Sequence, residues 1–436
     1  MGGAAAQQDG GYMDGGKGLN IWDALSDGHV KNGDTCHVAC DHFHRWKEDL
    51  QLLKELGVNS YRFSISLARI YPKDEFTVNE EGVQFYVDLV AELERLGIEP
   101  ICTLYHWDMP LWLHERGGWK TSLAVEWFER FTKTMVDAIS DKVKYWLTFN
   151  EPQIFVGHGY QTGEHAPFEK LPKEEIQNIS RNVMLAHGRA VRVIRKYAKL
   201  PPKIGLASTC DVLLPLDGDE EKAYQATFDS TRNGVYTPAW WCDPMLAGKA
   251  PNGCDWLSER DLKEIYEPLD FCAYNIYRAD VAEGFDYTYV GNPFTAIEWT
   301  ITPECMYYSA KFMYRRFGLP IMITENGMAN TDFIYEDGKV HDPQRSEFLR
   351  THIKNLKRAA DEGVPVIGYS CWSFMDNFEW AEGYGKRFGL VYVDYRTQKR
   401  IIKDSAYTFR EIIKENGRSE ERRVGKECRS RWSPYH

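Results

Sequence analysis

The chain has 436 residues, of which 43% are hydrophobic and 27% are charged, values typical of a globular protein rather than a disordered or fibrous one. Its net charge of −11 argues against nucleic acid as the main partner, because phosphate binding needs a cationic surface. No run of about 18 apolar residues is present, so no membrane-spanning helix is expected. The 14 Trp and 25 Tyr exceed what a core needs and suggest stacking surfaces for a ligand.

Short β-branched or aromatic runs alternate with amphipathic helical segments along the chain. Helices are predicted over 45–56 and 82–96, each followed by a glycine. Seven strands are predicted, over 60–65, 100–105, 143–149, 204–207, 271–274, 321–324 and 366–370. Apolar runs of this kind are typical of parallel strands that helices cover on both faces. At roughly 150 residues per domain the length suggests about three domains, but the uninterrupted alternation predicts one α/β domain, a (β/α)8 TIM barrel.

Both ends of the chain depart from this pattern. The eighth strand should precede Ser60, but the stretch 3–6 is short and has no β-branched residue. Strand one is therefore expected to be degenerate, or the chain begins inside it, and an incomplete strand would leave two unpaired barrel edges. Residues 1–416 are assigned to the barrel domain. Residues 417–436 have no apolar period and are interpreted as a disordered or foreign tail, with a cationic arm for nucleic acid as the alternative.

The ten cysteines include no CxxC pair, and the first residues do not resemble a secretory signal. We interpret the thiols as reduced and mostly buried, and expect a cytoplasmic protein. Cys36 and Cys40 form the one close pair. With His37, His42 and His44 nearby, metal ligation there is the alternative.

Polar side chains follow the predicted strands at their carboxyl ends, where the βα loops of a parallel barrel build the active face. Glu151 follows the strand 143–149 and Glu325 follows the strand 321–324, so two carboxylates can meet across the barrel mouth. Pro152 and Gly327 allow sharp turns just after the two acids. Either glutamate alone could equally well have a structural role, as a helix cap or as one partner of an ion pair. The two together predict catalysis.

Polar and aromatic residues also follow other predicted strands, at the same end of the barrel. Arg62, His106 and Asn275 come from three of them, and Trp372 follows the last strand. A single Arg or His at a strand end is usually structural, but packing alone does not explain so many at one face.

The two glutamate motifs, Thr148-Phe149-Asn150-Glu151-Pro152 and Ile323-Thr324-Glu325-Asn326-Gly327, resemble the signature motifs of glycoside hydrolase family one, the β-glucosidase family. Further segments that resemble the family are 41–45, 62–66, 106–110 and 372–380. The resemblance covers about residues 7 to 415, and the fold that it implies is the (β/α)8 barrel.

The resemblance implies retaining hydrolysis of terminal β-D-glucosyl residues by two carboxyl groups about 5–5.5 Å apart. Glu325 matches the nucleophile that forms a covalent glycosyl-enzyme, and Glu151 matches the acid/base. Arg62 and Tyr277 match positions beside the nucleophile and should favour its ionised form, and Asn275 belongs to the same catalytic group. The charge of Glu325 should in turn raise the pKa of Glu151.

Eight residues match substrate-binding positions of the family: Gln7, His106, Asn150, Trp299, Trp372, Glu379, Trp380 and Phe388. Spacing back from Lys17 favours Gln7 over Gln8 as the match. Trp372 resembles the platform under the sugar ring. Trp299 resembles the aromatic residue on the leaving-group side, although it could instead be a core residue at the start of the following helix.

Two other functions stay open. One is 6-phospho-β-glucosidase activity, but this chain has Glu379-Trp380 where those enzymes carry phosphate-binding residues, and a carboxylate would repel phosphate. The other is a non-catalytic sugar-binding or scaffold protein on the same fold, against which both glutamates argue.

The expected partner is a small β-glucoside or oligosaccharide, with galactosides or fucosides as companions, and neither nucleic acid nor a membrane. No cofactor or metal is implied, because two acids suffice. Whether the chain forms a homo-oligomer is left open.

Overall fold

The computed structural model describes residues 1–215, 218–281 and 293–415, so the predicted tail 417–436 lies outside the described residues. Within these ranges, seven parallel strands form one sheet in the order β1-β2-β3-β4-β6-β8-β9. They are β1 (Ser60–Ser64), β2 (Glu99–Tyr105), β3 (Tyr145–Asn150), β4 (Lys203–Thr209), β6 (Cys272–Asn275), β8 (Ile321–Asn326) and β9 (Val366–Cys371). All seven predicted strands are confirmed, each within two residues at either end.

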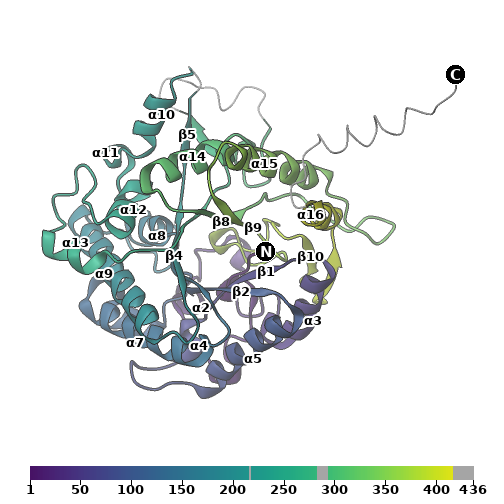
Figure 1. Ribbon diagram of the computed structural model, residues 1–436. Helices are drawn as coiled ribbons and strands as arrows, with labels where there is room; N and C mark the ends of the chain where they lie inside the picture. The colour runs from purple at the N-terminus through teal and green to yellow at the C-terminus, as the bar shows by residue number, and fades with distance from the viewer. Residues whose placement is uncertain (216–217, 282–292, 416–436) are drawn as a thin grey trace.

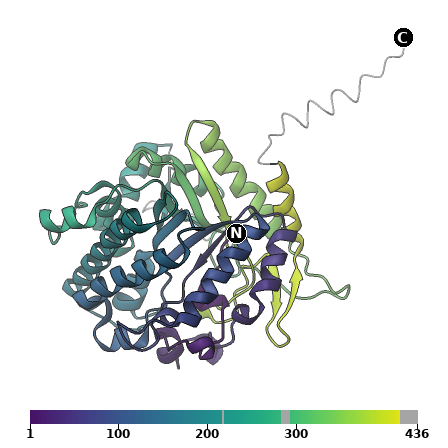
Figure 2. The ribbon, with the colours of Figure 1, turned by 60° about the horizontal axis from the view of Figure 1, so that its bottom comes forward.

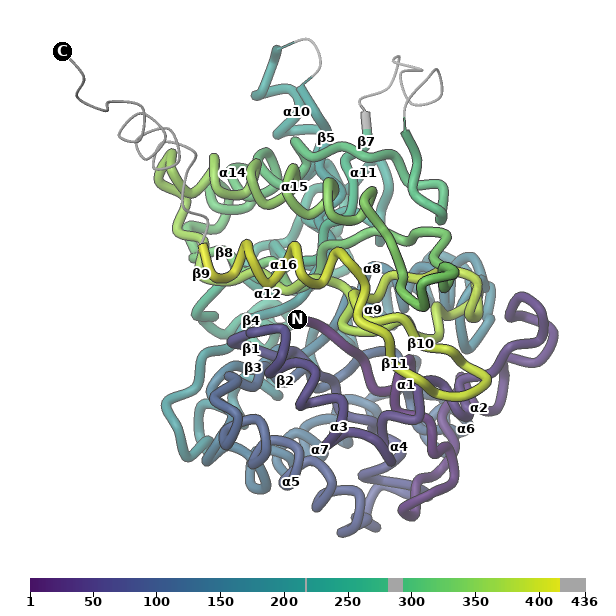
Figure 3. Tube along the Cα trace, turned by 90° about the vertical axis from the view of Figure 1, so that its right-hand side faces the viewer, coloured from purple at the N-terminus to yellow at the C-terminus, as the bar shows by residue number. Residues whose placement is uncertain are grey.

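Helices connect these strands and surround the sheet (Figures 1 and 2). The longer ones are α3 (His42–Glu55), α5 (Glu80–Leu96), α7 (Ser122–Ile139), α9 (Lys173–Tyr197), α14 (Cys305–Phe317), α15 (Pro343–Asp361) and α16 (Asp404–Glu415). In α5 the residues Phe85, Leu89 and Leu93 recur at helical spacing and are buried, which gives the helix one apolar face. The helices predicted over 45–56 and 82–96 correspond to α3 and α5. The last helix, α16, packs against α15 on the outside of the barrel (Figure 3).

Shorter elements build the two ends of the barrel. The short α-helices are α1 (Ala5–Gln8), α2 (Ile21–Leu25), α4 (Leu67–Ile70), α6 (Leu111–Glu115), α8 (Pro152–Val156), α10 (Glu220–Thr227), α11 (Ser230–Asn233), α12 (Pro238–Ala247) and α13 (Glu259–Ile265). Two small sheets accompany them: β5 (Val212–Leu214) pairs with β7 (Ala279–Val281) in parallel, and β10 (Val391–Asp394) pairs with β11 (Lys399–Ile402) antiparallel. No helix in the described ranges is long and apolar enough to cross a membrane.

The segment 1–3 takes the place of the first strand, between β1 and β9 (Figure 1). On one side the amide of Arg62 donates to the carbonyl of Met1 at 2.8 Å, and the amide of Gly3 donates to the carbonyl of Arg62 at 2.9 Å. On the other side the amide of Gly2 donates to the carbonyl of Cys371 at 3.0 Å. Of the two alternatives for strand one, the structure shows the degenerate strand, and backbone hydrogen bonds join it to both barrel edges. A degenerate strand of three residues nearly closes the barrel.

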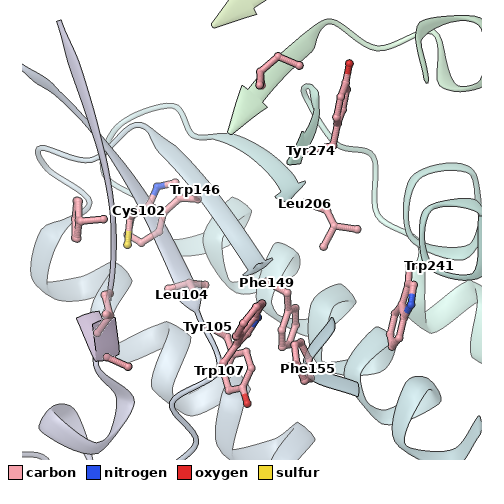
Figure 4. Packing of buried hydrophobic residues seen from close by; sticks show 14 of the residues in the cluster. Cys102, Leu104, Tyr105, Trp107, Trp146, Phe149, Phe155, Leu206, Trp241 and Tyr274 are labelled. Atoms are coloured by element: carbon pink, nitrogen blue, oxygen red, sulfur yellow. The ribbon is translucent and has the colours of Figure 1, made fainter. Parts of the chain in front are cut away.

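Large apolar side chains fill the space around the strands (Figure 4). Tyr105, Phe149 and Phe155 lie together there, with ring centroids 5.6 Å apart for Tyr105–Phe149 and 4.9 Å apart for Tyr105–Phe155. The largest fully buried side chains include five tryptophans: Trp22, Trp119, Trp127, Trp146 and Trp241. Much of the aromatic excess therefore serves the core rather than a ligand surface.

The nine cysteines of the described residues are free and buried, as predicted. At the alternative metal position, the thiol of Cys40 donates to the carbonyl of Asp376 at 2.9 Å, and His42 is hydrogen-bonded to Asp49 at 2.8 Å. Across the described part of the chain, no three His, Cys, Asp or Glu side chains form a group that could hold a metal ion. Metal ligation at Cys36 and Cys40 is therefore not supported.

Candidate active site

A cavity of about 880 Å³ opens at the carboxyl ends of the sheet strands. Eleven of the thirteen predicted site residues line it: Gln7, His106, Asn150, Glu151, Tyr277, Trp299, Glu325, Trp372, Glu379, Trp380 and Phe388. The other two, Arg62 and Asn275, are buried and hydrogen-bonded to its carboxylates. The fold thus brings together every residue that the sequence predicted for the site.

Glu151 lies at the turn between β3 and α8. Its own φ of 43° is in the left-handed region, and Pro152 occupies the first position of the helix, where a missing amide hydrogen costs nothing. The turn thus points the Glu151 side chain into the cavity. The amide of Asn275 donates to its Oε1 at 2.7 Å.

Glu325 lies within β8 and is held at both carboxylate oxygens. Arg62 Nη1 donates to Oε1 at 2.5 Å, and the Tyr277 hydroxyl donates to Oε2 at 2.6 Å. Arg62 comes from β1, 263 residues before Glu325 in the chain, and is 1% exposed. A buried carboxylate with a guanidinium and a phenol as donors is suited to remain ionised.

The pKa of both glutamates is raised, and that of Glu151 is raised further. The pKa of Glu325 is raised by burial, but the charge of Arg62 and the hydrogen bond from Tyr277 oppose that rise. The pKa of Glu151 is raised well above its usual range, first by burial and second by the charge of Glu325. The pKa of Glu151 therefore lies above that of Glu325, in the predicted direction, and Glu325 loses its proton first. The larger cause at Glu151 is burial, however, and not its neighbour's charge.

Two threonines that sequence reasoning missed hold the donors in place. Arg62 Nε donates to the Thr103 hydroxyl at 3.0 Å, while its Nη2 donates to Asn150 Oδ1 at 2.6 Å. The Thr324 hydroxyl donates to Asn275 Oδ1 at 2.7 Å, which aims the amide of Asn275 at Glu151. Thr324 lies within one of the two glutamate motifs, but nothing in the sequence indicates its bond to Asn275; Thr103 is in no motif, and threonine is common in strands.

The polar floor of the cavity combines groups from three distant segments. Gln7 Nε2 donates to the carbonyl of Phe378 at 2.9 Å, and the Asn150 amide lies 3.2 Å from His106 Nε2. Burial lowers the pKa of His106 well below its usual range, so the ring is neutral. Among the described residues, Gln7 Oε1 and His106 Nδ1 are buried without a hydrogen-bond partner. The neighbouring Gln8 instead donates to the Tyr61 hydroxyl at 2.8 Å.

Aromatic rings form the cavity walls. Trp372 lies nearly parallel to the ring of His106, with centroids 5.9 Å apart. Trp299 is half-buried and packs against the cluster of Trp372 and Phe388, with its ring centroid 5.1 Å from that of Tyr277 and 6.0 Å from that of Phe388. Because α14 begins only at Cys305, the alternative that Trp299 is a core residue at a helix start is wrong.

The family described as glycosyl hydrolase family 1 has a sequence model that matches residues 1–418. The chain belongs to this family. β-Glucosidase A of Thermotoga maritima is 39% identical over 432 residues, which cover 95% of this chain and 96% of the relative. An aryl-phospho-β-D-glucosidase of Bacillus subtilis is 32% identical, with 95% of this chain and 96% of that relative covered.

Solved structures agree with the sequence matches. The β-glucosidase from Thermotoga maritima in complex with deoxynojirimycin has a TM-score of 0.87 and 37% identity, with 95% of this chain and 97% of that chain covered. The single-domain barrel fold and the assignment as a glycoside hydrolase are thus established. The alternative of a non-catalytic scaffold protein is not supported.

The family 1 enzyme differs from the sequence-based expectation at Glu379. Burial, together with the charges of Glu325 and Glu382, raises the pKa of Glu379 to about 8. Near neutral pH this residue is therefore mostly protonated, and it repels a phosphate less than a carboxylate would. The two neighbouring cations are engaged by the protein: Lys386 Nζ donates to the carbonyl of Ala296 at 2.7 Å, and Arg387 is paired with Asp376. Phosphate binding is disfavoured by this engagement more than by the charge of Glu379.

The outer wall of the cavity was missed by sequence reasoning. It includes His158, Glu164, Asp211, Tyr236, Arg278 and Asp280. These residues lie outside the strands of the large sheet, in segments without a recognisable motif, so no sequence signal could have found them.

Proposed function

We propose that this family 1 enzyme is a retaining β-glucosidase that releases terminal β-D-glucosyl residues from small β-glucosides. The observation that carries the proposal is the pair of buried glutamates whose neighbours separate their pKa values in the direction that double displacement needs. The names of the relatives support the substrate: β-glucosidase A and, at 38% identity, the 1,4-β-D-glucan glucohydrolase of Thermotoga neapolitana.

In the first step the Glu325 carboxylate attacks the anomeric carbon while the bond to the leaving oxygen breaks. Glu151 gives its proton to that oxygen, so the leaving group departs as a neutral alcohol. Arg62 and Tyr277 hold Glu325 in the ionised form through bonds of 2.5 Å and 2.6 Å. The product of this step is a glycosyl ester on Glu325.

In the second step the ester no longer carries the charge that helped to raise the pKa of Glu151. Glu151, now ionised, takes a proton from water, and the water oxygen attacks the anomeric carbon from the face that the leaving group vacated. The bond to Glu325 breaks, and its carboxylate returns to Arg62 and Tyr277. Two inversions at one carbon give net retention.

We assign the glycone hydroxyls to Gln7, His106, Asn150 and Glu379. All four residues line the cavity beside the two glutamates, which supports this assignment. Trp372 serves as the platform under the sugar ring, with Trp380 beside it. Trp299 and Phe388 flank the leaving-group side. β-Fucosides are proposed as further substrates, supported by a bifunctional β-D-glucosidase/β-D-fucosidase of Bifidobacterium breve that is 36% identical.

A cytoplasmic location is part of the same proposal, supported by the free thiols of the described residues. A role in cellulose degradation is supported by the glucan glucohydrolase among the relatives. We assign residues 1–416 to the catalytic domain, which is supported by the family match over 1–418.

Proton NMR of 4-nitrophenyl β-D-glucoside hydrolysis tests the stereochemistry, because β-glucose must form before mutarotation produces the α anomer. Glu325→Ala should lose more than about 10⁴-fold in turnover. Azide should rescue it and yield the α-glycosyl azide. Glu151→Ala is the matched control: its loss should be about 10²–10⁴-fold, and azide should yield the β-glycosyl azide. Initial release of α-glucose would refute the mechanism. Faster turnover of the glucoside 6-phosphate than of the glucoside would instead favour the phospho-β-glucosidase.

A further inference from the structure

Six charged side chains form a buried ion network beside the cavity wall: Asp332, Asp342, Arg345, Asp376, Arg387 and Lys403. Three are cations and three are carboxylates, so the network is electrically balanced. Lys403 is its centre, because its Nζ lies 2.6 Å from both Asp332 and Asp376 and its side chain is 0% exposed. Buried charges at this depth are costly unless they are paired, so removing one member leaves another without its partner.

Asp376 connects the network to the segment 387–389. Its Oδ1 accepts the amide of Gly389 at 3.0 Å as well as the ammonium of Lys403. Its Oδ2 accepts Arg387 Nη1 at 2.6 Å. The residues on either side of Phe388 are therefore both bonded to one carboxylate, which fixes the position of the phenylalanine between them.

Phe388 connects that segment to the nucleophile. Its ring centroid lies 5.9 Å from that of Tyr277, and it packs in one apolar cluster with Trp372. Tyr277 in turn donates to Glu325. A continuous line of contacts thus runs from Asp376 through Phe388 and Tyr277 to the carboxylate that we assign as the nucleophile.

The second carboxylate on Lys403 reaches the segment 387–389 only indirectly: Arg345 Nη2, which donates to Asp332, also donates to the backbone carbonyl of Arg387 at 2.8 Å. Asp332 accepts from Arg345 Nη2 at 2.7 Å and from the amide of Asn330 at 3.1 Å. Asp332 and Asp376 therefore make equivalent, equally buried bonds to one ammonium, but only Asp376 also bonds the backbone beside Phe388. This difference provides a matched pair of variants.

We propose that Asp376 and Lys403 are positioning residues of the active site: they hold the segment 387–389 so that Phe388 keeps Tyr277 in hydrogen-bonding contact with Glu325. The inference rests on the proposed function, since it concerns the nucleophile of that reaction. It assigns no contact with substrate to either residue. Loss of the Tyr277 bond would raise the pKa of Glu325, and the enzyme would then need a higher pH to work.

The test compares Asp376→Asn with Asp332→Asn in the full chain, using 4-nitrophenyl β-D-glucoside. Both variants should lower the thermal midpoint, because each removes one partner of Lys403. Asp376→Asn, which loses direct bonds to the segment 387–389, should lower kcat by about tenfold or more and move the acidic limb of kcat/KM to higher pH, whereas Asp332→Asn should have a clearly smaller effect on both. Asp243→Asn breaks a bidentate Arg316 pair between α12 and α14 and serves as a control for stability alone.

A double variant identifies the route of the effect. If Asp376 acts through Tyr277, Asp376→Asn should add no further shift of the acidic limb in a Tyr277→Phe background. Where Asp376→Asn does not fold, Lys403→Met/Asp376→Asn and Lys403→Met/Asp332→Asn restore the charge balance and give the same comparison. Equal pH profiles for the two aspartate variants, or additive shifts with Tyr277→Phe, would overturn the inference. An inactive wild type would instead overturn the proposed function.

Discussion

Glu151 and Glu325 are both glutamates, but the groups around them give their carboxyl groups different pKa values. Glu325 receives donors from Arg62 and Tyr277, whereas the donor to Glu151 is the neutral amide of Asn275. Each donor stabilises the ionised form of the carboxylate that it contacts. The working enzyme needs Glu325 ionised and Glu151 protonated, so kcat/KM should follow a bell-shaped pH profile. Its acidic limb reports Glu325 and its basic limb reports Glu151.

Tyr277→Phe should therefore move the acidic limb, whereas Asn275→Ala should move mainly the basic limb, because the Asn275 amide bonds Glu151 and lowers the pKa of Glu325 less than Tyr277 does. Removing the Tyr277 hydroxyl raises the pKa of Glu325, so the acidic limb moves to higher pH and activity below it falls by about tenfold or more. Removing the Asn275 amide raises the pKa of Glu151, so the basic limb moves to higher pH. Each variant is the control for the other in pH-dependent measurements of kcat/KM. If one variant moved both limbs equally, the separate assignment of the limbs would be contradicted.

The ends of β8 and β9 approach one another closely at Gly327. A Cβ atom at this position would lie 1.8 Å from the carbonyl oxygen of Trp372. The sequence-based reason for this glycine, a sharp turn after Glu325, is therefore replaced by another: the backbone must leave room for the segment that carries the Trp372 platform. Steric contact between two strand ends is invisible in the local sequence.

Gly327→Ala should accordingly displace Trp372 and lower kcat/KM by about tenfold or more, with a lower thermal midpoint. Gly385→Ala is the matched control, because its Cβ would meet the Glu382 carbonyl oxygen at 3.4 Å, close to an ordinary contact. Kinetics and thermal unfolding of both variants check the difference. Unchanged kinetics in Gly327→Ala would show that the platform tolerates the displacement.

The barrel as a whole is closed unevenly. The segment 1–3 bonds to the carboxyl-terminal end of β9 at Cys371, whereas Ile367, nearer the start of the strand, is 49% exposed. Ile323 in β8 is 0% exposed. The carboxyl-terminal end of β9 is thus paired with the segment 1–3, while Ile367 near the opposite end of the strand is covered less.

Alanine substitutions in the two strands should therefore differ in their effect on stability. Ile323→Ala creates a cavity in the core and should lower the free energy of unfolding by about 2–5 kcal/mol. Ile367→Ala should lower it by about 1 kcal/mol or less, because half of its side chain already contacts solvent. Urea denaturation of both variants measures this directly. Comparable losses would mean that β9 is packed more tightly along its length than this exposure implies.

The sequence by itself determined the seven sheet strands and placed polar residues, among them Glu151 and Glu325, at their carboxyl ends; the remaining site residues came from the resemblance to the family. The physical reason is that strand burial and strand polarity are local properties, which an apolar run followed by a polar residue records directly. It also predicted the order of ionisation of Glu151 and Glu325, by resemblance to the family.

The tertiary structure decided what depends on residues far apart in the chain. The Arg62–Glu325 pair joins positions 263 residues apart, and Lys403 reaches Asp332 across 71 residues. Burial of Glu151, closure of the barrel by the segment 1–3 and the fit of Gly327 against Trp372 likewise arise only when distant segments pack. Charge, desolvation and steric contact act through space, so the local sequence carries no record of them.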